Sequence, residues 1–220
     1  MDWTYHYGDP ARLYLNVTNR CTNRCGFCVR AGVTGLGDGL LWGGPEPTLD
    51  ELLRAIDERH AGPLREVIWC GFGEPTYRLD LITGATPHLR RRAESIRLNT
   101  NGHAGLIHGR DVLPELAEAV DEVSVSLNAP NRERYLELCL PDPAMLGREP
   151  LRPDRGPTQR EHDPTPPEAF WDAMIDFLTR APQHFRRVQA SVVGAVLSAE
   201  EIEASRRLAR SLGVEGFRVR

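Results

Sequence analysis

The chain has 220 residues, enough for one substantial hydrophobic core, and its 40% hydrophobic and 26% charged content is ordinary for a soluble globular protein. The net charge of −4 argues against a general nucleic-acid-binding protein, which would normally be basic. All 27 basic residues are arginine, and the lack of lysine excludes Schiff-base catalysis and phosphate-loop nucleotide hydrolysis. We expect a cytoplasmic location without a membrane segment, because no apolar run reaches ~18 residues and the first residues do not resemble a secretory signal.

Short β-type runs alternate with longer helical ones along the chain. The first expected strand, 12–18, runs directly into a cluster of cysteines, and a glycine-rich segment follows at 31–47. Helical spacing of apolar residues over 48–60 begins with a capping box formed by Thr48 and Glu51. Further along we expect, in order, strand 66–70, a helix within 79–92, strand 95–101, helix 109–120, strand 122–128, helices 132–140 and 168–185, strand 188–197, helix 199–212 with Gly213 at its C-terminal end, and strand 216–220.

Residues 141–167 are rich in proline and charge and contain almost no apolar residues. Such a segment cannot bury a core face, so we expect a flexible insertion there and not a boundary between two cores. Residues 1–220 are therefore expected to form one domain.

Strands that alternate with helices indicate a parallel sheet with crossover helices. Several of the expected strands carry a row of polar residues on one face, as at Arg97, Asn99 and Asn101. A doubly wound sheet buried on both faces would be apolar throughout, whereas a polar row suits the inner face of a barrel. We predict an α/β fold, an open, partial (βα)6 barrel of the TIM type, with its active site at the carboxyl ends of the strands.

Three of the five cysteines, Cys21, Cys25 and Cys28, have the spacing C-x3-C-x2-C directly after the first strand. Closely spaced thiolates bind soft metals, either zinc or an iron-sulfur cluster. A zinc site usually has a second pair of ligands, and an electron-transfer cluster usually has four cysteines, which leaves Cys70 or Cys139 as an open possibility for a fourth. Three cysteines without an obvious fourth predict an iron with an open coordination position, where a cofactor or substrate binds.

The run CTNRCGFC, with Phe27 as its aromatic residue, resembles the signature of the radical S-adenosylmethionine (radical SAM) superfamily. The turn GFGEP at 71–75 resembles the motif that contacts the amino group of the cofactor in that superfamily, and the resemblance covers nearly the whole chain outside the insertion. It implies that the three cysteines hold a [4Fe-4S] cluster, and that reductive cleavage of S-adenosylmethionine yields a 5′-deoxyadenosyl radical. It further implies cofactor contacts by Phe27, Gly71, Gly73, Glu74 and Pro75, by Asn99, Asn101, Ser126 and Asn128 late in the third and fourth strands, and by Gly194 in the fifth.

Within the superfamily, the runs RLNTNG, LIHGRD and SVSLNAP resemble the TatD-associated radical SAM proteins, which implies a functional association with a TatD-type nuclease. The insertion and the lack of an auxiliary-cluster domain depart from the usual pattern. We expect an unidentified small-molecule substrate and an external one-electron donor of the flavodoxin or ferredoxin type. The alternatives are an activase that places a glycyl radical on a partner protein and a non-catalytic iron-sulfur electron carrier.

Five further residues are candidates for contact with the substrate. Histidine near neutral pH transfers protons, and arginine binds anions, although each of these residues also has an ordinary structural interpretation. Cys139 is a further candidate, as a thiol that donates hydrogen, although a structural role is the stronger interpretation. The five are His103, His108 and Arg110 after the third strand, and Arg218 and Arg220 in the last.

Overall fold

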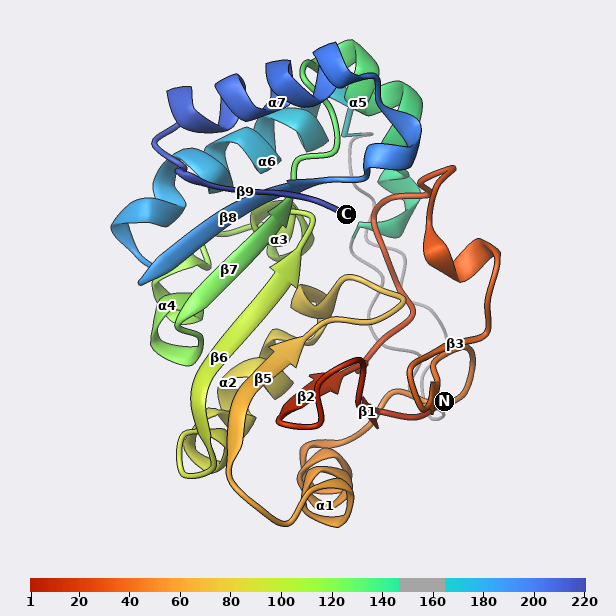
Figure 1. Cartoon of the computed structure of the whole chain (residues 1–220), viewed down its shortest axis with the longest axis vertical. Helices are drawn as coiled ribbons and strands as arrows, with labels where there is room; N and C mark the ends of the chain where they lie inside the picture. Colours follow the sequence, from red (N-terminus) through yellow and green to blue (C-terminus); the bar gives the residue numbers. More distant parts are fainter. Residues whose placement is uncertain (147–164) are drawn as a thin grey trace.

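The computed structural model describes residues 1–146 and 165–220, and its centre is a seven-stranded sheet (Figure 1). Every neighbouring pair from the second strand of the sheet to the last is parallel, and only the first pair is antiparallel. The strands lie across the sheet in the order β1 (Thr4–Tyr5), β2 (Arg12–Leu15), β5 (Leu64–Trp69), β6 (Ala93–Thr100), β7 (Glu122–Ser126), β8 (Arg187–Val192) and β9 (Gly216–Val219).

The sheet is open, because β1 and β9 stand at opposite ends of its order. It is also curved (Figure 1). The six parallel strands β2, β5, β6, β7, β8 and β9 confirm the predicted α/β fold with a partial barrel. Helices connect the strands and cover the outside of the curve (Figure 1). They are α1 (Leu49–Arg59), α2 (Leu79–Leu89), α3 (Ala104–His108), α4 (Leu113–Ala119), α5 (Arg132–Cys139), α6 (Glu168–Arg180) and α7 (Ala199–Ser211), with short 3-10 turns η1 (Val29–Ala31), η2 (Pro75–Arg78), η3 (Pro143–Met145), η4 (Ala181–Gln183) and η5 (Gly194–Val196).

The two faces of the sheet differ in chemistry, as the polar rows predict. The outward-facing residues Val67, Leu98 and Val125 are fully buried against the helices in the main hydrophobic core. On β6 the residues on either side of Leu98, Arg97 and Asn99, are only half-buried and face the inside of the curve. Sequence alternation therefore separates a dry outer layer from a polar inner face.

The expected elements are present, with three notable differences. The helix expected over 109–120 is present as α4 but begins only at Leu113. Gly109, with a left-handed φ of +63°, ends α3, and the Asp111 carboxylate accepts a hydrogen bond from Leu113 N at the start of α4. The strand expected over 188–197 stops at Val192 and gives way to η5. The strand expected over 12–18 stops at Leu15, and its last residues turn toward the cysteines.

Two small strand pairs were not predicted from the sequence. The two-residue strand β1 extends the sheet by an antiparallel pairing with β2. The glycine-rich segment 31–47 folds into a hairpin of β3 (Gly35–Leu36) and β4 (Gly39–Leu40). Leu41 beyond it packs with Tyr5 and Phe72 in a small second hydrophobic cluster. Strands this short carry no periodic signal, so tertiary packing decides them.

Most of the predicted insertion at 141–167 lies outside the described residues, which resume at 165. No helix in the described ranges is long and apolar enough to cross a membrane. An open pocket of about 370 Å³ lies between residues 1–4 and α1, and no residue of the cysteine motif lines it.

Candidate active site

The three cysteines lie on the loop that leaves β2, and each is half-buried. Arg30, two residues after Cys28, ties this loop together: its guanidinium donates to the carbonyl oxygens of Asn19 at 3.2 Å and Phe72 at 3.1 Å. The same guanidinium donates to the carbonyl oxygen of Asn23 at 3.4 Å. One guanidinium therefore satisfies two carbonyl oxygens of the loop, those of Asn19 and Asn23, and one of the neighbouring turn, that of Phe72.

The C-terminal end of α5 is hydrogen-bonded to the other side of the same loop. Arg24 N donates to the carbonyl oxygen of Cys139 at 3.0 Å, and Gly26 N donates to that of Leu138 at 3.2 Å. Asn23 and Pro141 form an isolated antiparallel bridge. The last carbonyl oxygens of a helix lack partners within the helix, and here the amides of the cysteine loop supply them.

A buried chain of side chains runs beneath the loop. Thr22 Oγ1 lies 2.8 Å from His103 Nδ1, and His103 Nε2 lies 2.9 Å from Tyr135 Oη. Asn101 Nδ2 donates to Thr22 Oγ1 at 2.7 Å, and Asn23 Nδ2 donates to Tyr135 Oη at 3.1 Å. His103 is fully buried, and desolvation lowers its pKa to about 3, so the ring is neutral at physiological pH. His103 therefore has no exposed surface for a substrate and instead links Thr22 of the cysteine loop to Tyr135 of α5.

The thiols have unequal environments. Burial raises the pKa of Cys21 to about 12, so its thiolate is stable only beside a compensating positive charge. The thiols of Cys25 and Cys139 interact, which lowers the pKa of Cys25 and raises the pKa of Cys139 well above its usual value. Cys139, on α5, is thus adjacent to the motif despite lying 114 residues from Cys25 in the sequence, a proximity that was left open by the sequence alone.

The GFGEP turn after β5 lies against the loop that precedes the cysteines. Gly71 has a φ of +129°, and a Cβ there would meet Asn16 Oδ1 at 2.1 Å. A Cβ on Gly73 would meet the carbonyl oxygens of Thr18 at 2.3 Å and Arg20 at 2.6 Å. Both glycines are therefore required for the close approach of these two loops.

Glu74 is almost fully buried, and four hydrogen bonds hold its carboxylate. Thr76 donates its backbone N–H at 3.2 Å and its hydroxyl at 2.8 Å, Thr100 Oγ1 donates at 2.8 Å, and Asn101 N donates at 2.7 Å. Burial nevertheless raises the pKa of Glu74. Pro75 follows at the start of η2. The carboxylate thus joins the turn to the end of β6.

Asparagine side chains at the ends of β6 and β7 leave acceptors free. Asn99 Nδ2 donates to Cys70 Sγ at 3.3 Å, and Asn128 Nδ2 lies 3.9 Å from Cys139 Sγ. The Oδ1 atoms of both are buried without a hydrogen-bond partner among the described residues. Asn128 also has a left-handed φ of +57°. Buried, unpartnered amide oxygens beside half-buried thiols fit a bound group that offers amino or hydroxyl donors.

The other predicted site residues contact different parts of the structure. His108 Nε2 lies 2.7 Å from the carbonyl oxygen of Thr76, and Arg110 pairs with Glu115 at 2.6 Å on the surface. Gly194 lies in η5 instead of the expected strand, and a Cβ there would meet Val219 Cγ1 at 2.7 Å. Phe27 packs against the main core, and Arg220 Nη2 donates to Ser126 Oγ at 2.9 Å on the inner face of the sheet. No three His, Cys, Asp or Glu side chains within residues 1–146 and 165–220 are close enough together to hold a single metal ion.

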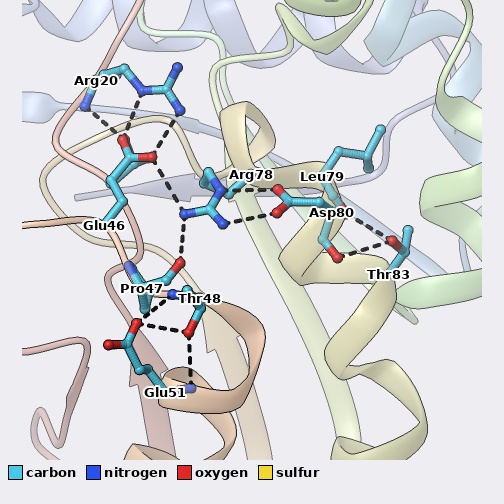
Figure 2. A network of polar contacts seen from close by, with 10 residues as sticks. Arg20, Glu46, Pro47, Thr48, Glu51, Arg78, Leu79, Asp80 and Thr83 are labelled. Atoms are coloured by element: carbon cyan, nitrogen blue, oxygen red, sulfur yellow. Dashed lines mark hydrogen bonds and ion pairs between the residues drawn. The ribbon is translucent and has the colours of Figure 1, made fainter. Parts of the chain in front are cut away.

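Sequence reasoning did not identify the acidic residue that anchors the start of the cysteine loop. In Figure 2, Arg20 and Arg78 converge on Glu46, with Arg20 Nε at 2.8 Å and Arg78 Nη1 at 3.4 Å from its carboxylate oxygens. Arg78 also forms a two-point ion pair with Asp80, at 3.0 Å and 2.9 Å. Glu46 lies in a glycine- and proline-rich segment without periodicity, so no local pattern marks it.

Comparisons with known proteins agree with this arrangement. Residues 15–145 match the family described as the Radical SAM superfamily, whereas no curated protein sequence matches the chain. Streptococcus suis SuiB bound to precursor peptide SuiA has a similar fold, with a TM-score of 0.63 and 15% identity over 96% of this chain and 39% of that one. Methylornithine synthase (PylB) gives 0.59 and 13% over 95% and 52%, and anSMEcpe with bound AdoMet gives 0.55 and 14% over 94% and 50%.

The fold is therefore that of a radical SAM partial barrel. Because the family match spans more than half of the chain, the protein belongs to the radical SAM superfamily. The chain spans about half or less of the length of these solved structures.

Proposed function

We propose that Cys21, Cys25 and Cys28 hold a [4Fe-4S] cluster and that the neighbouring strand ends bind S-adenosylmethionine. The observation that carries this proposal is the contact between the cysteine loop and the end of β6, where Asn101 Nδ2 lies 3.9 Å from Cys21 Sγ. At the ends of β6 and β7, the buried Oδ1 atoms of Asn99 and Asn128 have no partner among the described residues. When bound, these cofactors supply a 5′-deoxyadenosyl radical that abstracts a hydrogen atom from the substrate.

The chain's own residues position the cofactors and keep water out. Arg30 and the end of α5 fix the loop that carries the thiols, because they satisfy its backbone groups from two sides. The glycines at 71 and 73 let the GFGEP turn approach the loop before the cysteines closely. Phe27, Glu74 and Pro75 form the adjoining side of the proposed cofactor site. Asn101 and Ser126 line the strand ends, while Gly194 in η5 allows Val219 of β9 to pack closely against it.

Several finer assignments accompany this function. We propose one radical SAM core domain over 1–220, interrupted by the insertion at 141–167, and membership in the TatD-associated group on the strength of its motifs. We propose a small-molecule substrate, an external one-electron donor of the flavodoxin or ferredoxin type, and a cytoplasmic location, where thiols remain reduced. His108 and Arg110 stay candidates for substrate contact at the edge of the site.

One contact supports the alternative of a non-catalytic iron-sulfur electron carrier. Cys139 lies against Cys25, so a fourth thiolate ligand is at hand if the cluster has no open iron. The peptide bound to SuiB similarly keeps a polypeptide substrate, as for an activase, among the alternatives.

Anaerobic reconstitution of the protein tests the proposal. We expect about four irons per chain, as the [4Fe-4S] assignment requires, and release of 5′-deoxyadenosine with dithionite and S-adenosylmethionine. Cys25→Ala is expected to lose iron and product together, whereas the matched control Cys70→Ala, outside the motif, is expected to retain its iron. Loss of the cluster in Cys139→Ala, with no cofactor binding by the wild type, would establish the electron carrier instead.

A further inference from the structure

The inner face of the sheet carries a charge pattern that the proposed function does not use. Its two carboxylates, Glu66 and Glu122, lie toward the amino ends of β5 and β7. Glu66 is shared by Arg12 at 3.2 Å and Arg97 at 3.3 Å. Glu122 is shared in the same way by two further arginines, Arg186 at 3.0 Å and Arg187 at 3.3 Å. Each acid at this end of the sheet therefore already serves two cations.

The opposite, carboxyl end of the inner face has cations without acids. In the register of the sheet, Arg218 on β9 lies beside Ser191, which in turn lies beside Ser126, so all three point to the same side. Neither Arg218 nor Arg220 forms an ion pair within the described ranges. The guanidinium of Arg220 rests on a neutral hydroxyl, that of Ser126, at 2.9 Å.

The Arg220 side chain reaches across the sheet from its edge to its middle. Ser126 belongs to β7, two strands away from β9. The pKa of Arg220 lies below its usual value, mainly through desolvation, and the charges of Arg218 and Arg97 lower it further, whereas Cys70 acts in the opposite sense. The residue as a whole is nevertheless exposed. Figure 1 likewise places the C-terminus beside the arrowheads of the central strands.

Arg218 and Arg220 are both exposed, so solvent screens their charges and their guanidinium groups remain accessible to a ligand. The position matters as much as the charge, because active sites of parallel barrels lie at the carboxyl ends of the strands. Guanidinium groups bind carboxylate and phosphate oxygens in a two-point geometry. Neutral surroundings such as Ser126 and Ser191 leave that capacity unused.

We propose that Arg218 and Arg220 form a subsite for an anionic group, a carboxylate or phosphate, of the substrate. This assignment rests on the proposed function, which places the reacting centre at the same end of the sheet. It defines the substrate class as an anionic small molecule that is held from the β9 side of the inner face, opposite β2, from which the cysteine loop leaves.

Anion binding by the reconstituted protein tests the subsite, with inorganic phosphate as the probe in calorimetric titration. We expect phosphate affinity to fall about tenfold or more, about 1.4 kcal/mol, in the double variant Arg218→Gln/Arg220→Gln. The matched control Arg207→Gln/Arg210→Gln removes two exposed arginines from α7 and changes the net charge equally. Arg220→Lys, in an otherwise unchanged chain, should retain part of the affinity, because the charge remains but the two-point geometry is lost. An equal loss in the control pair, or no loss in the double variant, overturns the proposal.

A second arm distinguishes the substrate from the carboxylate of S-adenosylmethionine. We expect the double variant to bind S-adenosylmethionine within about twofold of the wild type, a difference well below the 1.4 kcal/mol of a tenfold change. A tenfold loss of cofactor affinity would assign the two arginines to the cofactor and overturn the proposal. Failure of the wild type to bind S-adenosylmethionine at all would instead contradict the proposed function, while the phosphate titration would still report on the subsite.

Discussion

Tyr135 Oη lies 2.9 Å from His103 Nε2, at the centre of a buried chain that joins α5 to the cysteine loop. A neutral imidazole donates one hydrogen bond and accepts one, so the ring links the Tyr135 hydroxyl on one side to the Thr22 hydroxyl on the other. Because Thr22 directly follows Cys21, the pair fixes the loop through side chains that never reach solvent.

Removing the Tyr135 hydroxyl is expected to weaken both the fold and cluster retention. Tyr135→Phe leaves a nitrogen of His103 and the amide of Asn23 without a partner, which costs about 1–3 kcal/mol in the free energy of unfolding. Urea unfolding of the metal-free protein measures this loss, and the iron content after reconstitution measures the effect on the loop. Tyr7→Phe, at a tyrosine that is 56% exposed, is the matched control and should change neither.

The depressed pKa of His103 predicts how stability depends on pH. Its folded-state pKa of about 3 lies below the ordinary 6.5, so as the pH falls the unfolded chain takes up this proton first. The contribution of neutral His103 is therefore complete above about pH 6.5 and is lost progressively toward pH 3, by at most about 1.4 kcal/mol per pH unit. Urea midpoints between pH 6.5 and 4.5 should fall more steeply for the wild type than for His103→Gln, and parallel slopes would refute this.

Loss of the Glu46 carboxylate is expected to loosen the start of the cysteine loop. Glu46→Gln deprives Arg20 and Arg78 of their shared acid, and their side chains are only 15% and 9% exposed. A cost of about 1–3 kcal/mol in the free energy of unfolding is expected, between the values for surface and fully buried pairs. Chemical denaturation of Glu46→Gln beside Glu118→Gln, an exposed acid on α4, gives the comparison, and similar values for the two would remove Glu46 from its anchoring role.

The close contact at Gly73 predicts a strong effect of a single methyl group. In Gly73→Ala the new Cβ would collide with the backbone carbonyls of Thr18 and Arg20, at 2.3 Å and 2.6 Å. We expect this variant to lose about 1–3 kcal/mol of stability. Gly62→Ala is the control, because its Cβ would meet only the His60 side chain, at 3.6 Å. Thermal unfolding of the two variants should differ clearly, and equal melting temperatures would show that the loops separate readily.

Local sequence determined the layers of the fold and marked the candidate site. Apolar alternation in the sequences of β6 and β7 is a local property, so the parallel sheet and its polar inner face were predictable. The helix α1 began at its predicted capping box of Thr48 and Glu51 because those hydrogen bonds lie within four residues of each other. The cysteine spacing likewise marked the site, because all three thiols belong to one short loop.

Only the tertiary structure decided which distant residues complete that site. His103, predicted as a substrate contact from its place after a strand, is buried, because Tyr135 and Thr22 meet it from segments 32 and 81 residues away. The approach of Cys139 to Cys25 and the pairing of Glu46 with two arginines depend equally on long-range packing. Periodicity and spacing report on what neighbours in the chain share, whereas burial and hydrogen-bond partners are set by which elements the folded sheet brings together.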